Sequence, residues 1–424
     1  MSENIVKLDA GFQNYDWGKE ASTSFVAKMK GLSGDTSGKN YAELWVGTHP
    51  SCPSYVVGGK KQSLSEFLEE PENQNKFFSP EHQRSTFKNT VPFLLKILSI
   101  RTALSIQAHP CKSLAEKLHN DNPDKYKDPN HKPELMCALT PFEALCCFRM
   151  LKQVVQFFKH SPELAELTKG QEIAAKWWDG KEPFPAADSD EERAALKAIM
   201  QNLYNADNAK VVEHLRTHLA KVKATQVYPE DALFARMYEQ YPDDVGCWMV
   251  YLLNYVQMTP GQALFLSDSE PHAYISGDGV EIMASSDNVV RAGLTPKWKD
   301  VSTLIEMLKY DTTGLASARH DCKSLVNAGF WQVQYYQPPS QFPDFSLYRL
   351  QHDNETGKGT ATVELPTIGL GFCLKGKAKV NGVLVSAGDC FAVPYGEAEV
   401  QADDSEALVF ISSTNEFNRP YANM

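Results

Sequence analysis

The segment Leu104-Ser105-Ile106-Gln107-Ala108-His109-Pro110 alternates between apolar and polar side chains up to its proline. Side chains of a β-strand point to opposite faces in turn, so a strand here would place Ser105, Gln107 and His109 together on one face. The apolar residues between them would face a protein core. An amide oxygen and an imidazole can both bind a metal ion. We therefore predict a strand that presents metal ligands from one side.

Two later segments offer further ligands, and they are Asn130-His131-Lys132-Pro133-Glu134 and Glu270-Pro271-His272-Ala273-Tyr274. Together with Gln107 and His109, the carboxylate of Glu134 and the imidazole of His272 form a set that suits zinc. A single histidine is more often structural than metal-binding, so the prediction requires these segments to meet in space. The eight histidines outside these three segments sit in no such grouping, and we interpret them as surface or structural residues.

Composition limits the class of protein and of partner. The chain has 424 residues, 42% of them hydrophobic, and a formal net charge of −11. This charge argues against nucleic acid or an anionic membrane as a partner. Nine cysteines without a Cys-x-x-Cys pair fit a reduced compartment, and neither a signal peptide nor a membrane-spanning run is evident. We expect a cytoplasmic monomer that binds a small molecule.

Turn residues and periodicity divide the chain into β-rich and helical parts. Short alternating runs predict strands up to residue 148 and again from residue 253, whereas residues 149–252 are mainly helical. In this helical part, Ser189 and Glu192 predict a capping box at a helix start. We predict a discontinuous β domain of residues 1–148 and 253–320, a helical insertion of residues 149–252 and a C-terminal β domain of residues 321–424.

The segment from Ser286 to Lys297 is polar and contains Arg291 and a glycine. One interpretation is a surface loop with solvated charges. The alternative is a cationic lip for an anionic substrate, because arginine offers a planar fork to oxyanions and lysine a point charge.

Six segments in this order resemble the type I phosphomannose isomerases, a zinc-dependent family, and they are Asn14–Lys19, Tyr41–Pro50, Leu104–Pro110, Asn130–Phe148, Glu270–Asp278 and Ser286–Lys297. The resemblance implies a mainly β fold: a cupin (jelly-roll) catalytic domain, an α-helical insertion and a second jelly-roll-like domain at the C-terminus. It also implies interconversion of mannose-6-phosphate and fructose-6-phosphate, which supplies mannose for GDP-mannose and glycosylation.

Carried over by motif, the resemblance implies roles for twelve residues. One Zn²⁺ per chain would be bound by Gln107, His109, Glu134 and His272; Arg291, Lys132 and Glu281 would be catalytic; Ser105, Lys297, Tyr274, Trp17 and Asp287 would bind substrate. The chain departs from the family pattern at Gly279 and Ile282, where cysteines are common, and at Cys147, where glycine is common. None of these three is a proposed ligand.

The chemistry of an aldose–ketose isomerase needs a base and an electrophile on opposite sides of an enediol. Arg291 stays protonated, so its role would be to stabilise oxyanions or hold substrate. Glu281 and Lys132 are both chemically able to act as the base, and the sequence does not choose between them. Two other functions stay open: an iron-dependent cupin oxygenase, and a sugar-phosphate-binding protein without activity.

Overall fold

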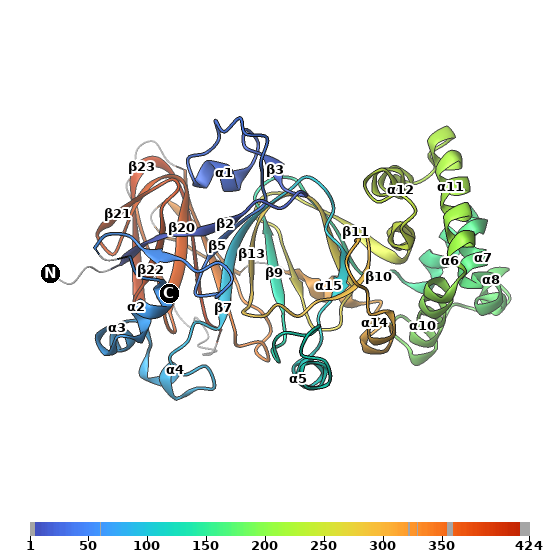
Figure 1. Cartoon of the computed structure of the whole chain (residues 1–424), viewed down its shortest axis with the longest axis horizontal. Coiled ribbons are helices and arrows are strands. Elements are labelled where there is room, and N and C mark those ends of the chain that lie inside the picture. The colour runs from blue at the N-terminus through green and yellow to red at the C-terminus, as the bar shows by residue number, and fades with distance from the viewer. Residues whose placement is uncertain (1–4, 60, 321–322, 329, 354–358, 416–424) are drawn as a thin grey trace.

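The computed structural model describes residues 5–59, 61–320, 323–328, 330–353 and 359–415. Three parts lie in a row along the long axis in Figure 1: the C-terminal strands at the left, a central group of strands, and a group of helices at the right. Within the described residues, every helix is too short or too polar to cross a membrane. The fold is mainly β with an α-helical insertion, as predicted.

The central part is an antiparallel sheet built around one long strand, β13 (His272–Ala284). The first residues of β13 pair with β8 and β10, and its later residues pair with β7 and β9. The other strands of this sheet are β2 (Gly11–Gln13), β5 (Glu43–Val46), β7 (Phe93–Ile100), β8 (Ile106–Ala108), β9 (Glu134–Ala138), β10 (Phe142–Phe148), β11 (Leu253–Met258), β12 (Ala263–Leu266), β14 (Val290–Gly293) and β15 (Arg319–His320).

The helical insertion leaves the sheet after β10 and returns at β11, and these two strands are paired neighbours. It contains α6 (Leu151–His160), α7 (Pro162–Thr168), α8 (Gly170–Ile173), α9 (Ala175–Trp178), α10 (Asp190–Asn205), α11 (Asn208–Ala224), α12 (Pro229–Gln240), the 3₁₀ helix η1 (Val245–Trp248) and α13 (Met249–Leu252). Its core continues into the sheet through buried Ile106 of β8 and Val290 of β14. The helices therefore support the strands that carry predicted site residues.

The predicted capping box at α10 is only half correct. The Ser189 side chain accepts from the Glu192 N–H, as expected of an N-cap. The Glu192 carboxylate, however, does not reach back to the Ser189 N–H. It is buried and accepts instead from the N–H of Leu151 (2.7 Å) and of Asp188 (2.8 Å). A tertiary contact thus replaces the local one.

The second sheet contains most of the C-terminal strands together with two strands from the N-terminal region. β1 (Val6–Asp9) pairs with β22, and β6 (Tyr55–Val56) pairs with β1. The others are β16 (Lys323–Ala328), β17 (Trp331–Tyr336), β18 (Ser346–Asp353), β19 (Thr360–Leu365), β20 (Gly369–Val380), β21 (Val383–Ser386), β22 (Cys390–Val393) and β23 (Gly396–Ser413). The domain limits stay a prediction, and β1 and β6 lie on the other side of the limit proposed at residue 320.

The remaining elements lie around the two sheets. They are the two-stranded pair β3 (Lys19–Glu20) and β4 (Asn40–Tyr41), and the helices α1 (Phe25–Met29), α2 (Leu64–Glu69), α3 (Pro71–Phe77), α4 (Pro80–Arg84), α5 (Lys112–Asp121), α14 (Val301–Met307) and α15 (Gly314–Ala318). The two sheets share one buried cluster, in which Leu95 and Phe265 of the central sheet lie with Phe372 of the second. The sheets are therefore packed on each other.

The close approach of η1 to β14 yields a first prediction. A Cβ atom on Gly246 would lie 2.7 Å from the backbone N of Leu294 and 2.9 Å from Cα of Gly293. Gly246→Ala must therefore push β14 away, and we expect a loss of about 1–3 kcal/mol in the free energy of unfolding. Because β14 carries Arg291, kcat/KM of the reaction that the resemblance implies should fall as well. Thermal unfolding and steady-state kinetics measure both, and Gly34→Ala, which has open space for its Cβ, serves as the control.

Candidate metal centre and active site

The side chains of the four predicted metal ligands converge on one point. Gln107 lies on β8, His109 directly after it, Glu134 on β9 and His272 on β13. The backbones of Gln107 and His272 are register partners, and His109 follows β8 directly. His109 Nε2 lies 3.3 Å from Glu134 Oε1, and His272 Nε2 lies 3.5 Å from Glu134 Oε2. The Gln107 amide lies 3.4 Å from His272 Nε2. Antiparallel pairing thus brings together the three distant segments.

Both imidazoles are oriented by backbone carbonyls. His109 Nδ1 lies 2.7 Å from Asn288 O, and His272 Nδ1 lies 3.0 Å from Glu270 O. A carbonyl oxygen can only accept, so each Nδ1 carries the proton and each Nε2 keeps a lone pair directed at the cluster. His109 Nε2 is fully buried and has no hydrogen-bond partner within the described part of the chain. Such an orphaned acceptor is expected where a cation binds.

The spacing within the cluster fits zinc. Ligand atoms about 2.0–2.1 Å from a tetrahedral ion are about 3.3–3.4 Å apart, close to the separations of the atoms around Glu134. The Gln107 amide has its nitrogen toward His272 and its oxygen toward the Ser105 hydroxyl. Amide nitrogen and oxygen exchange by a rotation that leaves the shape unchanged, and this places the oxygen toward a cation. The four predicted ligands therefore fit the metal.

Electrostatics hold the ligands in their metal-binding protonation states. Burial lowers the pKa of His109 to about 4, although the charge of Glu134 opposes the shift. Burial by itself would raise the pKa of Glu134, but Lys132 and His109 keep it well below its usual range. Lys132 Nζ lies 3.1 Å from Glu134 Oε1, so these two side chains lie on the same side of the chain. At neutral pH the cluster offers a carboxylate and a neutral imidazole.

A cavity of about 920 Å³ opens beside this cluster. All eight predicted catalytic and substrate-binding residues line it, together with two of the ligands: Trp17, Ser105, Gln107, Lys132, Glu134, Tyr274, Glu281, Asp287, Arg291 and Lys297. His109 and His272 are buried behind its wall. Tyr274 contributes through the metal site, since its hydroxyl donates to Glu134 Oε2 at 3.4 Å.

Two cations facing the cavity lack carboxylate partners. Among the described residues, neither Arg291 nor Lys297 is within ion-pair distance of a carboxylate. Arg291 is half-buried in β14, where its backbone pairs with Gln107, a predicted ligand. Burial lowers the pKa of Arg291, yet an arginine remains protonated in proteins. These unpaired charges favour an anionic substrate, in agreement with the cationic-lip interpretation of this segment.

Sequence reasoning missed Lys96, which lines the same cavity. Its ammonium lies 3.4 Å from Glu43 Oε2 and 3.3 Å from Glu281 Oε2, and it sits 4.8 Å from the centre of the Trp45 ring. Burial would lower the pKa of Lys96, but the two carboxylates raise it above its usual value. The available signal was a lysine inside β7, whose eight residues are all buried and otherwise carry no charge.

Glu281 has the electrostatic character of a proton carrier. It is buried, and its Oε2 lies 3.3 Å from the Lys96 ammonium. Burial and the charge of Glu134 raise the pKa of Glu281 to about 7, with Lys96 opposing the shift. A carboxyl group with a pKa near the working pH can both take up and release a proton. The carboxylates of Glu134 and Glu281 therefore suit different roles. Glu134 stays ionised and can bind a metal ion, whereas Glu281 can carry a proton.

A second histidine cluster lies in the helical insertion, where His160 and His218 meet Asp231. His160 Nε2 lies 2.9 Å from Asp231 Oδ1, and the Tyr251 hydroxyl donates to Asp231 (2.9 Å) and contacts His218 Nε2 (2.8 Å). These are hydrogen-bond distances, shorter than the separations of ligand atoms around zinc. We interpret the cluster as a hydrogen-bond network of the helical core.

Comparison with known proteins gives consistent matches. Residues 5–151 match the model of the phosphomannose isomerase type I catalytic domain, and residues 170–253 match that of the helical insertion domain. The mannose-6-phosphate isomerase of Eremothecium gossypii is 35% identical over 97% of this chain and 98% of its own. The human mannose-6-phosphate isomerase is 41% identical over 82% of each chain.

Solved structures give the same result. A crystal structure of mannose 6-phosphate isomerase from Salmonella typhimurium, bound to its substrate f6p and to zinc, has a TM-score of 0.79 and 26% identity. It covers 97% of this chain and 100% of the Salmonella chain. The match confirms the predicted cupin-type fold with its helical insertion. By fold, motif order and overall sequence identity, the chain belongs to the type I phosphomannose isomerase family.

Proposed function

We propose that this protein is a zinc-dependent enzyme that interconverts mannose-6-phosphate and fructose-6-phosphate. The observation that carries the proposal is the cavity of about 920 Å³, which joins the cluster of Gln107, His109, Glu134 and His272 to two cations that have no carboxylate partner among the described residues. The relatives named mannose-6-phosphate isomerase and the Salmonella enzyme bound to f6p and zinc support it. The zinc ion would be bound by Gln107, His109, Glu134 and His272.

When bound, zinc acts as a Lewis acid that polarises the sugar carbonyl and stabilises negative charge on its oxygen. The surrounding residues of the chain contribute binding and proton transfer. We assign Arg291 to the stabilisation of negative charge on the sugar, because it lines the cavity and its backbone is the register partner of Gln107. Ser105, Trp17 and Asp287 line the same cavity and are assigned to substrate binding.

We assign the proton transfer between C1 and C2 to Glu281. Its raised pKa, near 7, lets it alternate between acid and base. Lys132 is a weaker candidate, because its ammonium forms an ion pair with Glu134, 3.1 Å away. Lys132 is therefore assigned to orienting the metal-binding carboxylate and to contacts with substrate oxygens.

Lys297 is assigned to the phosphate group. Its side chain lines the cavity and lacks a carboxylate partner among the described residues. Lys297→Ala should raise KM by about tenfold while kcat stays within about twofold, because an ionic contact made equally in substrate and transition state affects binding alone. Steady-state kinetics with mannose-6-phosphate measures this. A fall in kcat at unchanged KM would contradict the assignment, and Lys299→Ala, whose ammonium pairs with Asp244, is the neighbouring control.

The proposed function is tested by converting mannose-6-phosphate with purified protein as prepared, after chelation, and after addition of zinc. We expect activity that is lost on chelation and restored by zinc. Oxygen uptake measured in parallel should stay at background. A folded, zinc-loaded sample that binds fructose-6-phosphate without turnover would support a binding protein instead, and oxygen consumption with iron would support an oxygenase.

We further propose that the enzyme acts as a cytoplasmic monomer and supplies mannose units for GDP-mannose and glycosylation. The net charge of −11 and the thiol content support a cytoplasmic protein without nucleic-acid or membrane partners. Sedimentation of the zinc-loaded protein would test the monomer, and fractionation of cells would test the location.

A further inference from the structure

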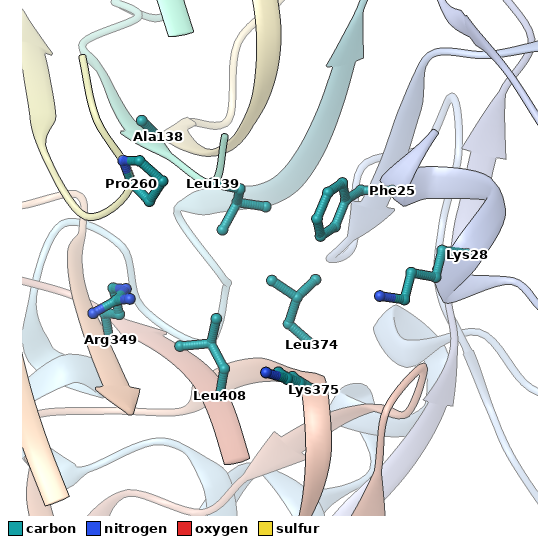
Figure 2. A pocket seen from close by; sticks show the side chains of 9 residues that line it. All are labelled: Phe25, Lys28, Ala138, Leu139, Pro260, Arg349, Leu374, Lys375 and Leu408. Carbon is teal, nitrogen blue, oxygen red and sulfur yellow. The ribbon is translucent and has the colours of Figure 1, made fainter. Parts of the chain in front are cut away.

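A second cavity, of about 150 Å³, lies between the two sheets and is lined by none of the proposed metal ligands. Ala138 at the end of β9, Leu139 and Pro260 form one side, and β18, β20 and β23 of the second sheet form the other. Helix α1 closes a third side with Phe25 and Lys28 (Figure 2). The cavity shares no lining residue with the active-site cavity.

The middle of this cavity is apolar. Figure 2 shows the side chains of Phe25, Leu139, Leu374 and Leu408 grouped at its centre, with Pro260 beside them. An apolar cavity of this volume accepts a molecule about the size of benzene. An occupant with an apolar body of that size would cover these side chains from water.

The rim of the cavity is cationic. Arg349 lies on one side, and Lys28 and Lys375 lie on the other (Figure 2). Lys375 forms an ion pair with Glu406. Among the described residues, Arg349 and Lys28 have no carboxylate within ion-pair distance. In a chain with a net charge of −11, two unpaired cations at one cavity are a local excess that favours an anion.

Arg349 is the strongest anion-binding group in this cavity. Its side chain is only 8% exposed, and buried charges are normally paired. Its partners are neutral: the amide oxygen of Gln334, at 2.6 Å, and that of Gln351. An arginine has five N–H donors, so donors remain for a ligand. A carboxylate is the matching acceptor, because it can bind a guanidinium through two oxygens.

We propose that this cavity binds a small organic monocarboxylate whose apolar body is about the size of a benzene ring. Its carboxylate pairs with Arg349, and its body lies against the leucines and Phe25. An inorganic anion fits less well, because most of the lining offers no hydrogen bonds. The site is independent of the isomerase reaction and of the zinc ion.

The experiment is calorimetric titration of the zinc-loaded, full-length protein with benzoate, in the presence of saturating fructose-6-phosphate. Benzamide, which has the same shape without the charge, and acetate, which has the charge without the ring, are the comparison ligands. We expect benzoate to bind and the other two to bind at least about tenfold more weakly, because each lacks one of the two complementary parts.

Three variants locate the site. Arg349→Gln should weaken benzoate binding by about tenfold or more. Leu139→Trp should also block it, by filling the cavity while all three cations remain. Lys377→Gln, at an exposed position of β20 two residues from Lys375, should bind benzoate like the unaltered protein. Isomerase activity and thermal unfolding show whether each variant is folded.

Several results would overturn the proposal. Absence of benzoate binding to the unaltered protein would do so. The proposal would also fail if the Arg349→Gln and Leu139→Trp variants bound benzoate as tightly as the unaltered protein. Competition by fructose-6-phosphate, with weakening in Lys297→Ala, would place benzoate in the active site instead. If Arg349→Gln does not fold, Leu139→Trp alone decides, because it changes the volume of the cavity and leaves its charges unaltered.

Discussion

His109→Ala is expected to abolish zinc binding and to lower kcat by at least about a thousandfold, since zinc contributes several kcal/mol of charge stabilisation. His109 Nε2 is buried, lies 3.3 Å from Glu134 Oε1 and has no hydrogen-bond partner among the described residues. Without its imidazole, the site keeps one histidine, one carboxylate and one amide, which is a weak set for zinc. Elemental analysis of the dialysed protein and the isomerase assay measure the two effects.

The control for this prediction is His214→Ala. His214 lies on α11 in the helical insertion and contacts Glu166, far from any proposed ligand in sequence. This variant should keep one zinc ion per chain and full activity. Zinc retained at one equivalent in His109→Ala, with a normal far-ultraviolet circular dichroism spectrum, would exclude His109 as a ligand.

Glu281→Gln is the second large effect that we expect, with kcat lowered by about 10²- to 10⁴-fold and zinc content unchanged. Glutamine keeps the shape of the side chain but cannot accept the proton. KM should change little, because the variant removes a function needed in the transition state alone. The ion pair with Lys96, 3.3 Å away, is lost too, so thermal unfolding must be compared.

The pH profile provides a readout that a structural role would not produce. A carboxyl group acts as a base only when deprotonated, so kcat/KM of the unaltered enzyme should rise with pH through the pKa of Glu281. That pKa is about 7. The positive charge of a bound zinc ion would shift this rising limb of the pH profile, in which kcat/KM increases, to lower pH. The limb should be absent in Glu281→Gln. If Lys132→Met removed the limb and Glu281→Gln kept it, the base would be Lys132.

Much of the metal centre could be predicted from the sequence. The alternation around Gln107 follows from the period of two in a β-strand, which is a local property. The resemblance then supplied the chemistry, and the solved relatives agree with it.

The tertiary structure decided the features that depend on distant partners. Lys96 became part of the site only because β5, β7 and β13 are neighbours, which places its ammonium between Glu43 and Glu281. In the same way, β1 joined the C-terminal sheet through a pairing with β22 across almost the whole chain.

The local pattern of the sequence by itself determined which side chains share a face, and the motifs determined which ligands belong together. Only the tertiary structure decided which faces meet, because register between strands and the burial of Glu192 against Leu151 arise from contacts far apart in the chain. The raised pKa of Glu281 has the same origin, since it depends on burial and on charges brought near by folding.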